Sequence, residues 1–158
     1  MKGAILNKGE KYYTNLGRVF DAIHNAQKHY NWLLTNVEAY PNNPLFYERL
    51  NAEYVWMTGN ELTDMVEKEN FPWIWAVFSG FPKSIIQEQV LKYKLPYADG
   101  YRDFWRNPVS IQHPLAEIEI VHWDSSLVLV ISRSDKIVED SVKDSSLAER
   151  RSAPKEDP

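Results

Sequence analysis

The most apolar stretch of the chain is Phe71–Phe81, which reads FPWIWAVFSGF. No charged side chain interrupts it, and Pro72 and Pro82 stand close to its two ends. A continuous apolar run of this length, bounded by prolines, is typical of a strand that is buried on both faces. We therefore predict that Phe71–Phe81 is a central strand around which the other elements are arranged.

Further strands are predicted where apolar residues cluster or alternate between turn-forming residues. They are Met1–Asn7, Asn31–Tyr40, Glu53–Met57, Ala116–Trp123 and Leu127–Ile131. The last two are separated by Asp124-Ser125-Ser126, which indicates a hairpin. Glu117 and Glu119 alternate with isoleucines in the first strand of this pair, so we expect both carboxylates on a face in contact with water.

The helices are predicted from apolar residues that recur every three or four positions. They are Leu16–Tyr30, Thr58 to about Glu69, Ser84–Tyr93 and Asp135–Lys143. Thr58 and Glu61 match the capping box, which indicates a helix start. Leu45–Leu50 has an ambiguous pattern. The Pro-, Gly- and aromatic-rich residues 94–114 indicate irregular chain with a single helical turn.

Together these elements predict an α+β fold in a single domain over residues 1–143. The predicted sheet is mixed or antiparallel and has about five strands, with two or three helices packed on it. From Asp144 to Pro158 seven residues are charged, and Leu147 is the one large apolar side chain. Such a segment buries too little surface to offset its ordering entropy, so we predict that 144–158 is a disordered, charged tail.

The overall composition is that of a soluble globular protein, and it argues against several classes of function. The 18 Lys+Arg and 22 Asp+Glu residues give a net charge of −4, which argues against nucleic-acid binding. No cysteine is present, so disulfides, thiolate metal sites and cysteine nucleophiles are excluded. We expect no secretory signal, because Met1–Leu6 has a single lysine and only a short apolar run, and no apolar run approaches the ~18 residues that a membrane span needs. We expect a cytoplasmic protein that binds neither nucleic acid nor membranes.

The sequence patterns of enzymes and cofactor proteins are not found. His24 and His29 lie five positions apart, and therefore do not share a helix face as paired metal ligands do. His122 and Asp124 point the same way along their strand and, with Ser125, have the residue types of a catalytic triad. Triads are assembled from distant segments, however. We therefore predict no catalytic residue, no metal and no cofactor, with a small enzyme that uses His122 and Asp124 as the alternative.

Two groups of residues suit contact with a protein partner. The segment from Tyr97 to Arg106 concentrates tyrosine, tryptophan and arginine, the types that carry much of the binding energy at protein interfaces. The helix predicted after Thr58 carries carboxylates that suit a basic partner. The predicted partner-binding residues are Tyr97, Tyr101, Arg102, Trp105, Arg106, Glu61 and Asp64. The alternatives are that the aromatic segment packs onto the sheet and that the carboxylates form a solvated helix face.

Four pieces of the chain resemble a family of small bacterial proteins known as domain-of-unknown-function family 2691. They are Tyr30-Asn31-Trp32, Trp75–Phe78 with Phe81-Pro82, Tyr101–Phe104 and the strand region Ile118–Val130. The order of elements is similar over most of Met1–Lys143. The long segments Tyr40–Ala52 and Leu91–Pro114 and the predicted tail depart from that family, which has no catalytic residues to carry over.

In general style the chain also resembles the immunity proteins of bacterial toxins, which are small, acidic, cysteine-poor α+β domains. This resemblance implies a non-catalytic inhibitor that acts in the cytoplasm. It would neutralise a cognate toxin by occluding the toxin's active site, and the partner would present a basic surface. A small-ligand-binding or regulatory domain, with a tryptophan-lined pocket between helices and sheet, is a further hypothesis.

Overall fold

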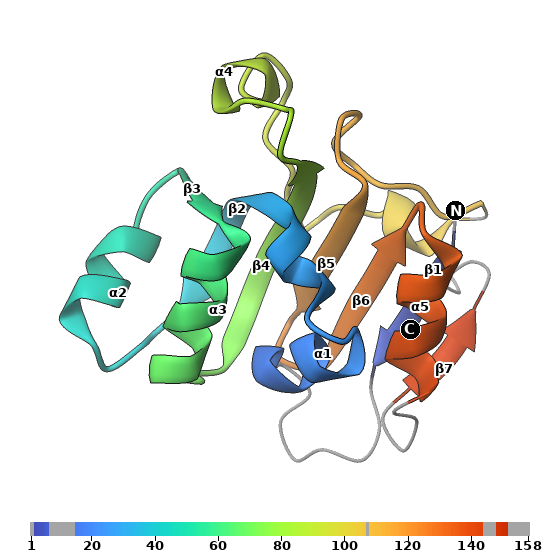
Figure 1. Cartoon of the computed structure of the whole chain (residues 1–158), viewed down its shortest axis with the longest axis horizontal. Helices are drawn as coiled ribbons and strands as arrows, with labels where there is room; N and C mark the ends of the chain where they lie inside the picture. The colour runs from blue at the N-terminus through green and yellow to red at the C-terminus, as the bar shows by residue number, and fades with distance from the viewer. Residues whose placement is uncertain (1, 7–14, 107, 144–147, 152–158) are drawn as a thin grey trace.

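A single antiparallel sheet organises the computed structural model of the chain, which describes residues 2–6, 15–106, 108–143 and 148–151 (Figure 1). From one edge to the other, its seven strands are β3 (Tyr54–Thr58), β2 (Tyr30–Ala39), β4 (Trp73–Pro82), β5 (Ile118–Trp123), β6 (Leu127–Ser132), β1 (Lys2–Leu6) and β7 (Ala148–Arg151). All hydrogen-bonded neighbours run antiparallel. The predicted α+β class is confirmed, with more strands than the five expected.

The strand β4 is buried on both faces, as its apolar sequence predicts. Phe78 packs into the core on one face, whereas Val77 and Phe81 pack into the core on the other. Gly80 allows β4 to approach its neighbours closely, because a Cβ atom there would lie 2.5 Å from Ile118 Cγ2 and 3.0 Å from the ring of Trp32. A side chain at this position would therefore displace two core residues.

Three helices cover one face of the sheet, which we call the helix face (Figure 1). The helix α3 (Gly59–Lys68) lies over β2 and β3, and α5 (Asp135–Lys143) lies over β1 and β6. The helix α1 (Leu16–Ala22) contacts both α3 and α5. The core between these helices and the sheet is apolar and rich in aromatic residues; its largest members include Trp32, Trp73 and Phe78.

The opposite face of the sheet is covered by residues 83–117, which we call the covering segment. It holds two short pieces of regular structure, the helix α4 (Gln87–Val90) and the 3₁₀ turn η2 (Asp103–Trp105). Val90, Phe104 and Trp105 from this segment are buried against the sheet. The prediction of irregular chain with one helical turn after residue 94 is confirmed.

The helix predicted over Leu16–Tyr30 is shorter in the structure. It ends at Ala22, and His24 and Asn25 have positive φ angles of 54° and 59°. A left-handed residue cannot continue an α-helix. A 3₁₀ turn, η1 (Ala26–His29), then leads into β2. Leu45–Leu50, whose pattern was ambiguous, lies in the helix α2 (Pro44–Leu50), which begins with an Asn43 cap.

The expectation that Glu119 faces water is wrong. Glu119 is fully buried under the covering segment, whereas Glu117 is partly exposed. Alternation predicts which side of the strand the carboxylate occupies, but it does not show that another part of the chain covers that side. The helix that follows the Thr58 cap and the hairpin at Asp124-Ser125-Ser126 are both confirmed.

The end of the chain lies partly outside the described residues. Within the range 144–158, where the sequence predicts a disordered tail, Ala148–Arg151 form β7 and pair with β1. Main-chain hydrogen bonds to a neighbouring strand do not need the apolar side chains that this segment lacks. Residues 144–147 and 152–158 are outside the described part. No helix in the described part is long and apolar enough to cross a membrane.

Candidate protein-binding surface

The aromatic segment predicted to bind a partner is largely packed against the sheet. Trp105 is only 4% exposed, and its ring contacts Trp123 with the two centroids 5.2 Å apart. Tyr97 and Tyr101 are partly exposed and pack edge to face on each other. Burial of Tyr101, together with the nearby Asp103 carboxylate, raises the pKa of its hydroxyl. The exposed members of the set are Arg102 and Arg106, and Arg106 forms an ion pair with Asp103 at 2.9 Å.

Side-chain hydrogen bonds to main-chain groups fix this segment on the sheet. Asn36, which has a positive φ of 51° in β2, accepts hydrogen bonds from the amides of Ala98 (2.9 Å) and Asp99 (3.1 Å). The side chain of Gln112 makes two hydrogen bonds to the main chain of Tyr97. These contacts explain the position of the segment without any partner.

Glu119 forms the most deeply buried of these attachments. Its carboxylate accepts hydrogen bonds from the amides of Gln112 (2.8 Å) and His113 (3.1 Å) and from the Ser79 hydroxyl (3.4 Å). Burial raises the pKa of Glu119 to about 7, although these hydrogen bonds oppose the shift. The His113 ring accepts from the Leu115 amide at Nδ1, so Nε2 carries the proton and donates to the Val90 carbonyl at 2.9 Å.

The predicted partner-binding residues do not form one surface. Tyr97, Tyr101, Arg102, Trp105 and Arg106 belong to the covering segment. Glu61 and Asp64 are exposed on α3, which packs on the helix face. The sheet lies between these two groups, so a single flat interface cannot contain both. The carboxylate group lies close to α2, which exposes large apolar side chains that a partner would bury.

His122 and Asp124 do not form an accessible pair. The His122 ring is fully buried between Trp73 (centroids 5.9 Å apart) and Phe78 (5.3 Å) on the helix face. Neither ring nitrogen has a hydrogen-bond partner within the described residues, and burial lowers the pKa of His122 to about 3. Asp124 is exposed in the hairpin turn. In this conformation His122 is a neutral core residue that no substrate reaches.

Three large apolar side chains are exposed at the β3 edge of the sheet, on α2 and the residues just before it. Leu45 is 73% exposed, Tyr40 64% and Tyr47 45%. A hollow of about 130 Å³ between the end of β2 and α2 is lined by Tyr40 and Tyr47, among others. Sequence reasoning missed this patch. The sequence pattern that indicates it is the helical spacing of Leu45–Leu50. In a helix this spacing places Phe46 and Leu50 toward the core, so Leu45 and Tyr47 are exposed.

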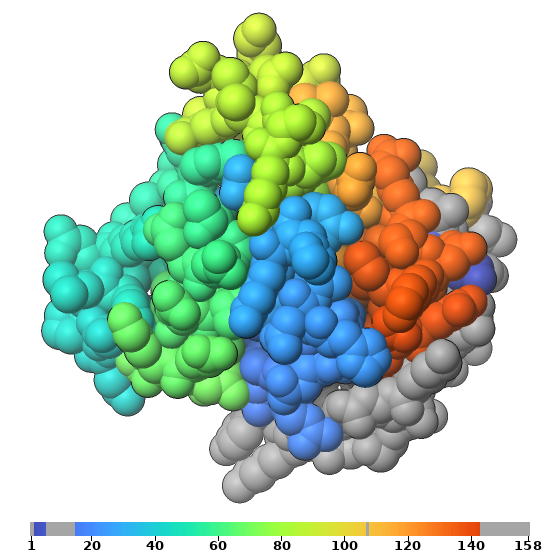
Figure 2. All heavy atoms as spheres, viewed as in Figure 1, coloured from blue at the N-terminus to red at the C-terminus, as the bar shows by residue number. Residues whose placement is uncertain are grey.

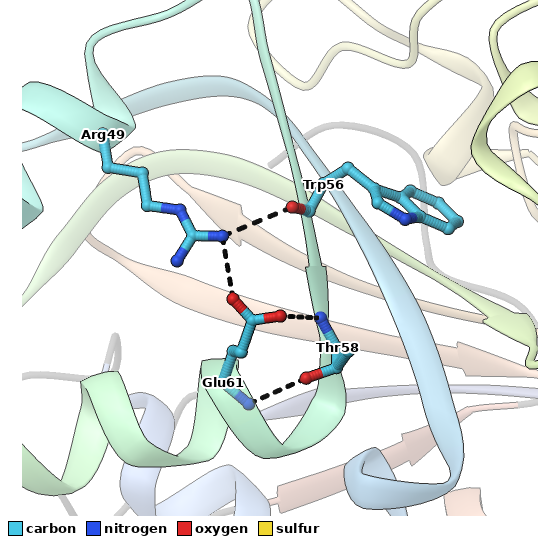
Figure 3. A network of polar contacts seen from close by, with 4 residues as sticks. All are labelled: Arg49, Trp56, Thr58 and Glu61. Atoms are coloured by element: carbon cyan, nitrogen blue, oxygen red, sulfur yellow. Dashed lines mark hydrogen bonds and ion pairs between the residues drawn. The ribbon is translucent and has the colours of Figure 1, made fainter.

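The helix α3 holds α2 at both of its ends. At the start of α3, Glu61 Oε2 lies 3.1 Å from the guanidinium of Arg49, which is in the last turn of α2 (Figure 3). At the end of α3, the carboxylate of Glu69 accepts hydrogen bonds from the amides of Asn42 (2.7 Å) and Asn43 (2.8 Å), just before α2. The two helices therefore run in opposite senses, and the exposed side chains of α2 are held in a defined position.

The Arg49–Glu61 pair also covers the outer edge of β3 (Figure 3). Arg49 donates to the Trp56 carbonyl at 3.4 Å, and Glu61 accepts from the Thr58 amide at 3.2 Å as part of the capping box. Partial burial acts to raise the pKa of Glu61, but the Thr58 amide and the Arg49 guanidinium lower it overall. The carboxylate is therefore ionised near neutral pH.

The negative charge of the chain is concentrated around this patch. Residues 38–70 hold seven Asp and Glu side chains against two Lys and Arg, a balance of −5, so the remaining residues carry +1 of the total of −4. Six of the seven carboxylates are exposed. We call the exposed patch and five of these carboxylates the α2–α3 surface. Its members are Glu38, Tyr40, Leu45, Tyr47, Glu48, Glu53, Glu61 and Asp64, whereas Glu67 lies on the α1 side of α3.

A second depression lies between α1 and α3. It has a volume of about 340 Å³, and most of the residues that line it are of polar types, with Asn15, Asp21, Glu67 and Asn70 among them. No tryptophan lines it, so it is not the tryptophan-lined pocket hypothesised from the sequence. Within the described residues no group of three or more His, Asp and Glu side chains is placed to hold a metal ion.

Comparison with known proteins found no family model, no curated protein and no solved structure that matches this chain. The resemblance to domain-of-unknown-function family 2691 therefore stays a prediction.

Proposed function

We propose that this protein is a non-catalytic binding protein of the cytoplasm that neutralises a cognate bacterial toxin, and thus acts as an immunity protein. The observation that carries the proposal is the α2–α3 surface, where three large apolar side chains are exposed amid the excess negative charge of the chain. Tyr40 and Tyr47 line one hollow, and Leu45, two positions from Tyr47, lies on the other flank of α2. Exposed apolar side chains rimmed by charges in this way are typical of a protein interaction site.

The charge and the apolar patch have different roles in binding. The carboxylates attract a basic partner over a distance of about a Debye length and raise the association rate. Tyr40, Leu45 and Tyr47 are desolvated in the contact, and burial of such side chains supplies much of the affinity. Because Glu61 and Glu69 already hold α2 in place, little conformational entropy is lost on binding.

Inhibition by this surface needs no chemistry from the protein. An enzyme that acts on an anionic substrate has a basic cleft, and an acidic surface with exposed aromatic side chains fits such a cleft in place of the substrate. We therefore expect the partner to be an enzyme with a basic active-site cleft. Its substrate and the α2–α3 surface would compete for the same residues.

The proposal is tested by capture of the partner from lysate of the source cells with matched variants. The double variant L45E/Y47E changes the exposed patch, and R102A changes an exposed residue on the covering segment as the control. We expect one protein to be retained by wild type and R102A and lost with L45E/Y47E. With that partner purified, calorimetry of L45A and Y47A should each show at least tenfold weaker binding.

Neutralisation is tested with the same partner. Expression of the partner alone should stop growth of a bacterial host, and co-expression of wild type, but not of L45E/Y47E, should restore growth. Equal binding by L45E/Y47E would show that the α2–α3 surface is not the interface. A partner that keeps its full activity in the saturated complex would overturn the inhibitor function.

A further inference from the structure

Among the residues that the structure describes, the exposed large apolar side chains fall into two regions of opposite charge. Tyr40, Leu45 and Tyr47 lie on the acidic α2–α3 surface. The other two are Ile86, 52% exposed, and Tyr93, 42% exposed, which flank α4. Residues 83–94 hold three lysines against one glutamate, a balance of +2. We call residues 83–94 the α4 knob; it projects from the top of the molecule, apart from α2 (Figures 1 and 2).

We propose that a second copy of this chain docks its α4 knob on the α2–α3 surface, so that copies associate head to tail. The two surfaces are complementary in charge, −5 over residues 38–70 against +2 over residues 83–94, and each exposes large apolar groups that the contact would bury. The inference concerns the purified protein alone and does not depend on a toxin partner.

Within the contact, each feature of the knob has a counterpart. Ile86 and Tyr93 face the apolar patch, where the hollow lined by Tyr40 and Tyr47 offers space for a side chain. Lys83 and Lys92, both exposed, face the carboxylates around the patch. Lys94 lies over the Tyr97 ring, 5.2 Å from its centroid, so we assign the charge contact to the other two lysines.

The arrangement has a defined symmetry. Because the knob and the α2–α3 surface are different parts of the chain, a single contact leaves one knob and one surface free. Association through single contacts therefore continues into short chains or a ring, in which each copy docks its knob on the next. Because the complementary charges are exposed, the association is weak and is screened by salt.

Sedimentation analysis of the purified protein tests the inference. The protein concentration runs from roughly 10 to 300 µM, which brackets the dissociation constants expected for weak contacts. In low salt we expect the average mass to rise above the 18.5 kDa of the monomer as concentration increases. High salt should return it to the monomer value. A protein that stays monomeric throughout the low-salt series overturns the proposal.

Three variants locate the contact. K83E/K92E removes the basic side of the knob, and E48K/E53K removes part of the acidic surface; each alone should stay monomeric. R102E/R106E changes the net charge by the same amount as K83E/K92E but lies outside the knob, so it should associate like wild type. All substituted residues are exposed, and circular dichroism melting curves confirm that each variant is folded.

A mixture of two variants distinguishes this arrangement from a symmetric dimer. K83E/K92E keeps an intact acidic surface, and E48K/E53K keeps an intact knob. When mixed they should associate again, because the intact knob of one variant docks on the intact acidic surface of the other, and the reversed charges of the altered knob and altered surface also attract each other. If the mixture stays monomeric while wild type associates, the contact is of another kind and the proposal is wrong. Neither outcome decides whether the protein binds a toxin, which the partner-capture experiment tests separately.

Discussion

The two faces of the sheet are covered by different means, and β5 shows the difference within four residues. On the helix face, His122 lies between aromatic rings without a hydrogen-bond partner in the described part of the chain. On the opposite face, Glu119 accepts three hydrogen bonds, two of them from the covering segment. One layer consists of amphipathic helices. The other is irregular chain that polar side chains attach to the sheet.

This difference indicates how stability is distributed. The helix face is held by a contiguous apolar core, which is lost only when the whole fold is lost. The covering segment has little regular structure and depends on attachments at Asn36, Gln112 and Glu119. We therefore expect the segment to open locally at a lower free energy than global unfolding requires.

The largest effect is expected from truncation of a buried aromatic residue on the helix face. Trp32 is fully buried and donates from Nε1 to the Gln27 carbonyl at 2.9 Å. W32A should lower the free energy of unfolding by about 4 kcal/mol, measured by urea denaturation. The control is W56A, which removes the same residue type from a partly exposed site on the other face and should cost less than half as much. Equal losses would show that the faces do not differ.

The next effect is the pH dependence that His122 introduces. Its pKa is about 3 in the folded protein and about 6.5 when unfolded, so the unfolded state binds a proton between these values. The stability due to neutral His122 is complete above about pH 6.5 and is lost as the pH falls toward 3. At pH 4 the loss should reach about 3 kcal/mol relative to H122L. Parallel stability curves for wild type and H122L from pH 7 to 4 would contradict this.

Glu119 should produce the opposite dependence on the other face. Its pKa is about 7 in the folded protein against 4.5 for a solvated carboxyl, so the closed segment holds a proton that the open segment releases. Protonated Glu119 therefore favours the closed segment at low pH, and this contribution is lost as the pH rises from about 4.5 through 7. Burial lowers the pKa of the His113 ring in the closed segment, so opening lets this ring take up a proton at low pH and partly opposes the effect of Glu119.

Hydrogen exchange measures this effect directly. After correction for intrinsic rates, amides of residues 83–117 should open at least tenfold more often at pH 8 than at pH 5.5. E119Q removes the group that favours opening at high pH and should abolish the rise toward pH 8, while the amides of β2 remain unaffected in both proteins. A rise toward pH 8 that persists in E119Q would assign it to another group.

The smallest effect is expected at the hairpin that joins β5 to β6. Asp124 and Ser125 both have positive φ angles, 48° and 56°, which is the geometry of a type I′ turn. Glycine adopts this conformation without strain, so S125G should raise the free energy of unfolding by about 0.5 to 1 kcal/mol. S126G, at a neighbouring residue that does not have a positive φ, is the control and should not stabilise the protein.

The sequence predicts the elements of the helix face better than the other layer. The Thr58 capping box and the apolar run after Pro72 depend on local spacing, and both predictions are confirmed. The burial of Glu119 depends on Gln112 and His113 coming back over the strand, which no local pattern encodes. The α2–α3 surface was predicted in part: Glu61 and Asp64 were identified from charge, but the exposure of Leu45 depends on how α3 orients α2.

The register of β1 has a consequence for synthesis of the chain. Ala4 pairs with Val130, so β1 leaves the ribosome long before its partner strand, which lies more than a hundred residues downstream. Until β6 has been translated, the inward-facing residues of β1 and the nearby edge of β5 remain uncovered. A nascent chain stalled before Leu127 therefore exposes an unpaired strand edge to its neighbours on a polysome. Strand β1 therefore joins the sheet late in translation. Between the translation of β1 and that of β6, the unpaired strand edges make the nascent chain prone to aggregate.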